Sequence, residues 1–265
     1  MQIVGESINS NIPSTGKAVQ SRDASFLAQL AREQRDAGAD MLDICAAAAG
    51  VNEIEVLPWL VQLVQAEMDM PLVLDSLNAQ AIEAALAVCQ GRVIINSLSG
   101  EERRWQELLP LVVEHHCGAV LMCMGSAGIP ATAQDRLSVA QELVDRALRA
   151  GIDPQDLYLD PLVLSIGASW QAGQVTLETL RLIRQNLPEV HTICAISNVG
   201  FGLPRRRLLN ASFLAMTVAL GVDTLLVNVL DKTVMATLWA ANAVAGNDES
   251  CLTYLKAYRA GRLQA

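Results

Sequence analysis

The sequence has no long apolar run and few basic residues. Although 52% of its 265 residues are hydrophobic, no run approaches the ~20 consecutive apolar residues that a membrane-spanning helix needs. Residues 1–6 lack a basic segment followed by a long apolar one, so we expect no signal peptide and a cytoplasmic location. With 19 basic against 28 acidic residues and a formal net charge of −9, the chain also lacks the basic face with which proteins neutralise nucleic-acid phosphates. We therefore expect neither a membrane nor a nucleic acid as partner.

Paired cysteines and clustered histidines are missing as well. The six cysteines form no Cys-x-x-Cys pair. Their spacing does not indicate a disulfide framework and fits a reducing compartment. His115 and His116 fall near an expected helix end and His191 precedes an expected strand, so we expect no histidine metal site. A magnesium site built from aspartates alone stays open as an alternative. No Ser-His-Asp order is present, and Lys17 and Lys232, the lysines near expected strand ends, are predicted to face solvent rather than to form a Schiff base.

Short apolar runs alternate with longer segments of helical period, a pattern typical of a parallel α/β sheet. The Val, Ile and Leu content of the runs fits strands that are covered on both faces. The expected strands are Ile3–Gly5, Met41–Cys45, Leu72–Leu74, Val93–Ile95, Ala119–Met124, Leu157–Leu159, Thr192–Ile196 and Thr224–Val227. Eight such units predict one (β/α)₈ (TIM) barrel spanning residues 1–265, close to the ~250 residues typical of that fold. An open doubly wound sheet is the alternative, but no Gly-x-Gly-x-x-Gly follows the first run.

Apolar residues at helical spacing predict helices around Phe26–Gln34, Leu137–Leu148 and Leu208–Leu220. Several segments stop at a glycine, where we expect a left-handed cap. These glycines are Gly38, Gly91, Gly118, Gly151 and Gly221.

Proline and the C-terminal tail give further expectations. Pro58 is expected to begin the main part of its helix, and Pro110 to kink the helix in which it lies. From about Gly246 onward, Leu252, Leu255 and Tyr258 lie at helical spacing. They predict a short C-terminal helix that packs on the barrel or contacts another subunit.

Polar residues follow seven of the eight apolar runs, at the strand ends where such barrels have their active sites. A single Asp or Asn in that place is commonly a helix N-cap, but seven in one chain indicate a shared mouth. Two carboxylates and two amides stand out, Asp75, Asn96, Asp160 and Asn198. A carboxylate accepts two adjacent N–H donors, while an amide supplies one acceptor and two donors. The set therefore favours a flat heterocycle bearing amino and carbonyl groups.

Several segments resemble the pterin-binding methyltransferases. These are Gly5–Asn9, Leu72–Ser76, Ile94–Ser97, Met124–Pro130 and Asp156–Leu162. The run Ile196–Pro204, followed by Leu209-Asn210 and Phe213–Ala215, resembles the methyltetrahydrofolate:corrinoid-protein methyltransferases and the folate domain of cobalamin-dependent methionine synthase. The resemblance covers nearly the whole chain.

This resemblance implies a homodimeric barrel that binds methyltetrahydrofolate and exchanges its methyl group with the cobalt of a cobalamin (corrinoid) carried by a separate protein. It implies that Asp75, Asn96 and Asp160 bind the pterin ring, while the catalytic residue Asn198 hydrogen-bonds the methylated N5 atom. A group that stabilises protonated N5 mainly in the transition state raises the rate. Tetrahydrofolate and the corrinoid are substrates in this scheme, and no bound metal is expected. Further candidates at the mouth are Glu6, Asn9, Asp43, Met124, Ser197, Asn228 and Arg206.

Two positions depart from the family pattern. Ser7 stands where many relatives carry arginine, and Cys45 where asparagine is common. The basic run Arg205–Arg207 either starts a helix in solvent or steers the acidic folate tail or the partner.

Two other functions stay open. Dihydropteroate synthase shares the barrel and pterin site, but its serine- and glycine-rich first loop and Lys-x-x-Ser-like segment correspond here to Asn9–Thr15 and Ser197–Pro204. A non-catalytic pterin-binding subunit that only docks on a corrinoid protein is the other alternative.

Overall fold

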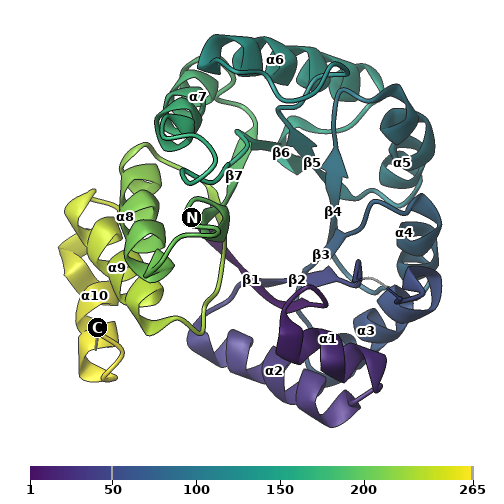
Figure 1. The fold of residues 1–265 in the computed structure, drawn as a ribbon, viewed down its shortest axis with the longest axis horizontal. Coiled ribbons are helices and arrows are strands. Elements are labelled where there is room, and N and C mark those ends of the chain that lie inside the picture. Colours follow the sequence, from purple (N-terminus) through teal and green to yellow (C-terminus); the bar gives the residue numbers. More distant parts are fainter. Residues whose placement is uncertain (49, 264–265) are drawn as a thin grey trace.

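The eight predicted strands are present and close into a barrel. The computed structural model describes residues 1–48 and 50–263. The parallel strands are ordered β1 to β8 around the barrel, and in Figure 1 the helices form a ring outside them. This arrangement confirms the predicted barrel over the open sheet. The strands are β1 (Gln2–Asn9), β2 (Met41–Cys45), β3 (Leu72–Asp75), β4 (Val93–Leu98), β5 (Gly118–Met122), β6 (Leu157–Asp160), β7 (His191–Ala195) and β8 (Thr224–Val227).

The helices follow the strands in alternation. They are α1 (Pro13–Gln20), α2 (Ala24–Ala37), α3 (Glu53–Glu67), α4 (Ala79–Leu86), α5 (Glu102–Glu114), α6 (Ala133–Arg149), α7 (Ala172–Asn186), α8 (Arg206–Ala219), α9 (Lys232–Val244) and α10 (Leu252–Arg259), with short 3₁₀ turns η1 (Pro154–Asp156), η2 (Ile196–Asn198) and η3 (Glu249–Cys251). The three helices predicted from periodicity correspond to α2, α6 and α8. Within the described residues, no helix combines the length and apolar character needed to cross a bilayer.

An apolar layer fills the barrel interior. Its position on the strands shows which side chains line the barrel at the C-terminal ends of the strands. The layer consists of Val4, Met41, Val73, Ile94, Val120, Tyr158 and Ile193, with Leu226 packed against it. Because side chains alternate between the two faces of a strand, the residue two positions later on each strand also lies on the inner face. That second row is Glu6, Asp43, Asp75, Asn96, Met122, Asp160, Ala195 and Asn228. The floor is therefore apolar, and the layer above it is mostly polar.

Two of the five glycine predictions are wrong as stated. Gly38, Gly151 and Gly221 have positive φ at helix ends, as expected. Gly91 also has a positive φ of 78°, but it lies beyond the end of α4. Gly118 is the first residue of β5, where an added Cβ would lie 3.0 Å from Cγ1 of Ile94. The left-handed residue after α5 is instead His116, with a φ of 51°.

The proline and tail predictions are confirmed only in part. Pro58 does not begin its helix, because α3 starts at Glu53 and Pro58 lies inside it. Pro110 lies inside α5 as expected, and its kink stays a prediction. The predicted C-terminal helix exists as α10, beside α9 in Figure 1. Leu252, Leu255 and Tyr258 are exposed and do not pack on the barrel, where Ala257 is the buried residue of α10. The alternative that these three residues contact another subunit stays a prediction.

Candidate active site at the barrel mouth

The polar residues of the second inner row lie together at the C-terminal ends of the strands. Cys45, Asp75 and Asn96 are aligned in register across β2, β3 and β4. On the other side, Met122 of β5 is aligned with Asp160 of β6. The mouth therefore brings together the three residues predicted to hold a pterin ring, Asp75, Asn96 and Asp160.

Burial controls the charge of the two aspartates predicted to bind the ring. Burial raises the pKa of Asp75 to about 6. The charge of Glu53 adds to this increase, whereas the hydrogen bond with Cys45 and the charge of Arg104 oppose it. Burial likewise raises the pKa of Asp160 to about 6, against a hydrogen bond of 2.8 Å from the Leu162 N–H and the charge of Arg136. Both carboxyls therefore change protonation close to neutral pH.

The inner row holds two further carboxyls, the buried Asp43 and the half-buried Glu6. Asp43 is 1% exposed, and burial, followed by the charges of Asp75 and Glu6, raises its pKa well above its ordinary value. Its Oδ1 has no hydrogen-bond partner within the described part of the chain. Burial also raises the pKa of Glu6, opposed by the hydroxyl of Ser197, the charge of Arg206 and the main chain of Asn228. The centre of the mouth thus favours uncharged carboxyl groups.

Asn198 lies in the turn η2, which directly follows β7. Its side chain is exposed, whereas its neighbour Ser197 is half-buried and hydrogen-bonded to Glu6. Asn198 is therefore accessible to solvent, and its neighbour Ser197 is held by the barrel.

Three other predicted candidates serve local turns. Asn9 accepts a hydrogen bond from the Asn11 N–H at 2.9 Å, and Asn228 accepts one from the Leu230 N–H at 3.0 Å. The carbonyl of Met124 accepts the Gly100 N–H at 2.7 Å. These contacts shape the loops around the mouth, and a role of the three residues in ligand binding stays a prediction.

Two buried arginines that sequence reasoning missed hold the loops beside the candidate residues. Arg104 of α5 donates to the carbonyls of Leu77 and Ser97, both at 2.7 Å. Arg136 of α6 donates to the carbonyls of Pro161 at 2.7 Å and Leu162 at 2.8 Å. The signal was their position on the apolar stripe of each helix, since a charged residue there must find partners.

The two departures from the family pattern are both buried. Ser7 is 7% exposed, and its N–H donates to Oε1 of Gln34 at 2.8 Å. Cys45 is 4% exposed, and burial raises the pKa of its thiol, so it stays protonated beside Asp75. Neither residue offers a charge to a ligand.

The basic run Arg205–Arg207 has structural roles that the sequence left open. Arg205 precedes the first residue of α8, as the helix-start reading expects, and Arg207 forms an ion pair of 3.0 Å with Asp231. In residues 1–48 and 50–263, no group of three or more His, Cys, Asp or Glu side chains is arranged to hold a metal ion.

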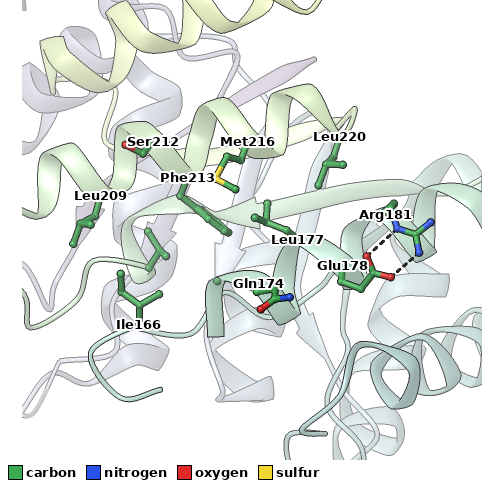
Figure 2. A pocket seen from close by; sticks show the side chains of 12 residues that line it. Ile166, Gln174, Leu177, Glu178, Arg181, Leu209, Ser212, Phe213, Met216 and Leu220 are labelled. Atoms are coloured by element: carbon green, nitrogen blue, oxygen red, sulfur yellow. Dashed lines mark hydrogen bonds and ion pairs between the residues drawn. The ribbon is translucent and has the colours of Figure 1, made fainter. Parts of the chain in front are cut away.

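A separate apolar groove of about 510 Å³ lies outside the barrel, between α7 and α8. Figure 2 shows Leu177 of α7 and Phe213 and Met216 of α8 pointing into it, with the Glu178–Arg181 ion pair at one end. Ile166, Gln174, Val199, Leu209 and Leu220 are among the other lining residues. The groove is distinct from the polar mouth.

Known proteins resemble this chain over most of its length. A family model described as "Pterin binding enzyme" matches residues 6–228. The chain is 31% identical to the methylcorrinoid:tetrahydrofolate methyltransferase of Eubacterium limosum, over 99% of this chain and 98% of that protein. It is 29% identical to the methionine synthase of Mycobacterium tuberculosis, over 85% of this chain but 20% of that longer protein.

Solved structures of similar fold include dihydropteroate synthases. That of Vibrio fischeri ES114 has a TM-score of 0.72 at 18% identity, covering 92% of this chain and 93% of that one. That of Xanthomonas albilineans in complex with 7,8-dihydropteroate has a TM-score of 0.67 at 21% identity, covering 94% and 93%. At such identities the structures show the fold alone. The family match and the full-length relative show more: this chain belongs to the pterin-binding enzyme family.

Proposed function

We propose that this protein is a methyltransferase that moves a methyl group between N5 of methyltetrahydrofolate and the cobalt of a corrinoid carried by a separate protein. The observation that carries the proposal is the polar layer of Asp75, Asn96 and Asp160 above an apolar floor. It is supported by the near full-length similarity to the Eubacterium limosum methylcorrinoid:tetrahydrofolate methyltransferase. A flat pterin ring matches that layer in shape and in hydrogen-bonding groups.

The ring is held by complementary hydrogen bonds in this proposal. Asp75 and Asp160 accept N–H donors of the ring, and the Asn96 amide both donates and accepts. Since each aspartate has a pKa of about 6, N–H donors favour its ionised form at neutral pH. Binding therefore replaces solvation that the buried carboxylates have lost.

The transfer needs help at N5 rather than a protein nucleophile. The electron pair of Co(I) attacks the methyl carbon, and the C–N electron pair stays on N5 as the bond breaks. A protonated N5 is the better leaving group, and the Asn198 carbonyl accepts a hydrogen bond from that N–H. Such a preorganised contact is worth ~3 kcal/mol when it forms mainly in the transition state.

Two alternatives are weaker. Dihydropteroate synthase is supported by structures that show the fold alone, whereas the near full-length curated relative is a methyltransferase. A pterin-binding subunit without activity differs from the proposal only in lacking transfer. A cytoplasmic location and a homodimer also belong to the proposal.

The test is to mix the protein with methyltetrahydrofolate and Co(I) cobalamin and to follow the cobalt absorbance. We expect methylcobalt formation, about 100-fold slower in Asn198→Ala at unchanged folate affinity. Asn186→Ala, at the far end of α7, serves as the matched control. Folate binding without transfer by the wild type favours the non-catalytic subunit, and an Asn198→Ala variant as fast as the wild type refutes the role of Asn198.

A further inference from the structure

The turn that carries Asn198 is bonded to the neighbouring loop on one side. The N–H of Ile166 donates to the carbonyl of Val199 at 3.0 Å, and Oγ of Ser165 donates to the carbonyl of Phe201 at 2.6 Å. These bonds join the β6–α7 loop to the residues that follow Asn198. They leave the preceding residue, Ser197, to be held by other groups.

Ser197 is held by a carboxyl group and a guanidinium group. Its hydroxyl donates to Oε1 of Glu6, which lies on β1 although β8 separates that strand from β7. Its carbonyl accepts a hydrogen bond of 2.9 Å from Nη2 of Arg206, the first residue of α8. The charge of Arg206 also acts on the half-buried Glu6 carboxyl. The side chain of Ser197 is thus hydrogen-bonded to Glu6, and its main-chain carbonyl is hydrogen-bonded to Arg206.

The start of α8 presses directly against the same turn. A Cβ added at Gly200 would lie 2.6 Å from Oδ1 of Asn210 and 2.9 Å from Cβ of Arg206. The guanidinium carbon of Arg206 lies 6.0 Å from the centre of the Phe201 ring. The turn therefore has little room to shift toward α8.

We propose that Glu6 and Arg206 are positioning residues that act together, through Ser197, to aim Asn198 at the reacting nitrogen. This inference rests on the proposed function and changes the part played by both residues, which the sequence grouped with the candidates for binding the substrate. An amide that favours a transition state must be held to within ~0.5 Å. Glu6 and Arg206 supply that precision without touching the substrate.

The variants separate positioning from binding. Ser197→Ala removes only the hydroxyl, and Arg206→Gln removes the charge. We expect each to lower kcat about tenfold, the worth of one such hydrogen bond, with the folate Kd changed less than about twofold. Ser197→Thr and Arg206→Lys keep the donor groups and should recover most of the rate. The controls are Ser138→Ala and Arg149→Gln on the outer face of α6.

The decisive measurement is a double-mutant cycle with Asn198→Ala. If Glu6 and Arg206 act through Asn198, then Ser197→Ala and Arg206→Gln cost nothing further once Asn198 is absent. Additive losses, or a folate Kd that rises as much as kcat falls, overturn the inference, because they place these residues on the substrate.

A readout that needs no transfer keeps the two proposals distinguishable. The side-chain amide signals of Asn198, assigned in an ¹H–¹⁵N spectrum by their loss in Asn198→Ala, should move in Ser197→Ala and Arg206→Gln but not in the controls. Unmoved signals overturn the positioning role even if the enzyme is active. Moved signals in a protein that never methylates cobalt support the positioning of Asn198 and refute the proposed function.

Discussion

Asp75 of β3 and Asn96 of β4 are register partners, and Cys45 of β2 continues the same row. The row lies on the inner face of the barrel, directly above the apolar layer that contains Val73 and Ile94. A carboxyl, an amide and a thiol are therefore offered side by side to one ligand edge. Only Asp75 in this row changes its charge near neutral pH, because the thiol stays protonated.

Folate affinity is expected to fall as the pH falls through about 6. Asp75 and Asp160 each have a pKa of about 6 without ligand, and only the ionised carboxylate accepts two N–H donors. Below that pH, binding must release about two protons, so the logarithm of the affinity should change with a slope approaching 2. Calorimetry between about pH 5 and pH 8 measures it. Asp160→Asn should halve the slope, and an affinity independent of pH contradicts the assignment.

Asp160→Asn should make the ligand-free protein more stable at neutral pH. A folded-state pKa of about 6, above the ordinary 3.8, means that the wild type loses stability as the pH rises from about 4 through about 6. About two pKa units correspond to at most about 3 kcal/mol. The amide oxygen keeps the bond from the Leu162 N–H, so we expect this gain at pH 7 and none near pH 4.

Denaturant unfolding at the two pH values checks that gain. Asp153→Asn is the matched control, since the exposed Asp153 also accepts a main-chain N–H, from Gln155 at 2.8 Å. An Asp160→Asn variant that is no more stable than the wild type at pH 7 shows that burial does not destabilise the ionised carboxylate of Asp160.

Gly200→Ala should disrupt the turn that carries Asn198. The added methyl would meet Asn210 Oδ1 at 2.6 Å, so either α8 or the turn must move. We expect a loss of about 1–3 kcal/mol in stability and of at least about tenfold in methyl transfer. Gly173→Ala in α7 is the control, because its nearest contact would be 3.4 Å away. Equal activity of the two variants refutes the close fit.

Arg104→Gln should destabilise the barrel, whereas Arg103→Gln should not. Arg104 is 6% exposed and bonds the carbonyls of Leu77 and Ser97. Removing it leaves buried carbonyls unpaired, at a cost of about 2–4 kcal/mol. Arg103 is its exposed neighbour, in an ion pair with Glu107 whose loss should cost less than about 1 kcal/mol. Urea unfolding of both variants measures the difference, and similar midpoints contradict it.

The proposed homodimer is expected to use the groove between α7 and α8. In a twofold interface the same patch meets itself, and this one combines an apolar floor with both charges of the Glu178–Arg181 pair. Met216, half-exposed at its edge, is the residue to change. Met216→Glu should convert a dimer to a monomer in sedimentation equilibrium, with Leu148→Glu on α6 as control. A wild-type monomer, or a dimer unaffected by Met216→Glu, contradicts this assignment.

Local patterns failed at three places in the chain. Gly118 stops a helical pattern, but close packing against Ile94 places it in β5. Pro58 lies within α3 although its sequence context resembles a helix start. The apolar residues of α10 share a face that faces solvent, while the small Ala257 makes the contact. In each case the residue type indicated a structural role, but the place of the residue in the fold could not be predicted from the nearby sequence.

Residue periodicity predicted the eight strands, the closed barrel and the polar residues that follow the strand ends, because strand and helix periods are local and a parallel barrel brings all strand ends to one edge. Which of those residues touch could not be predicted and is known from the folded structure. Glu6 and Ser197 are 191 positions apart, and burial in the folded barrel raises the pKa of Asp43, Asp75 and Asp160. Hydrogen bonds and desolvation act over a few ångströms, so they depend on distances in space that no local pattern encodes.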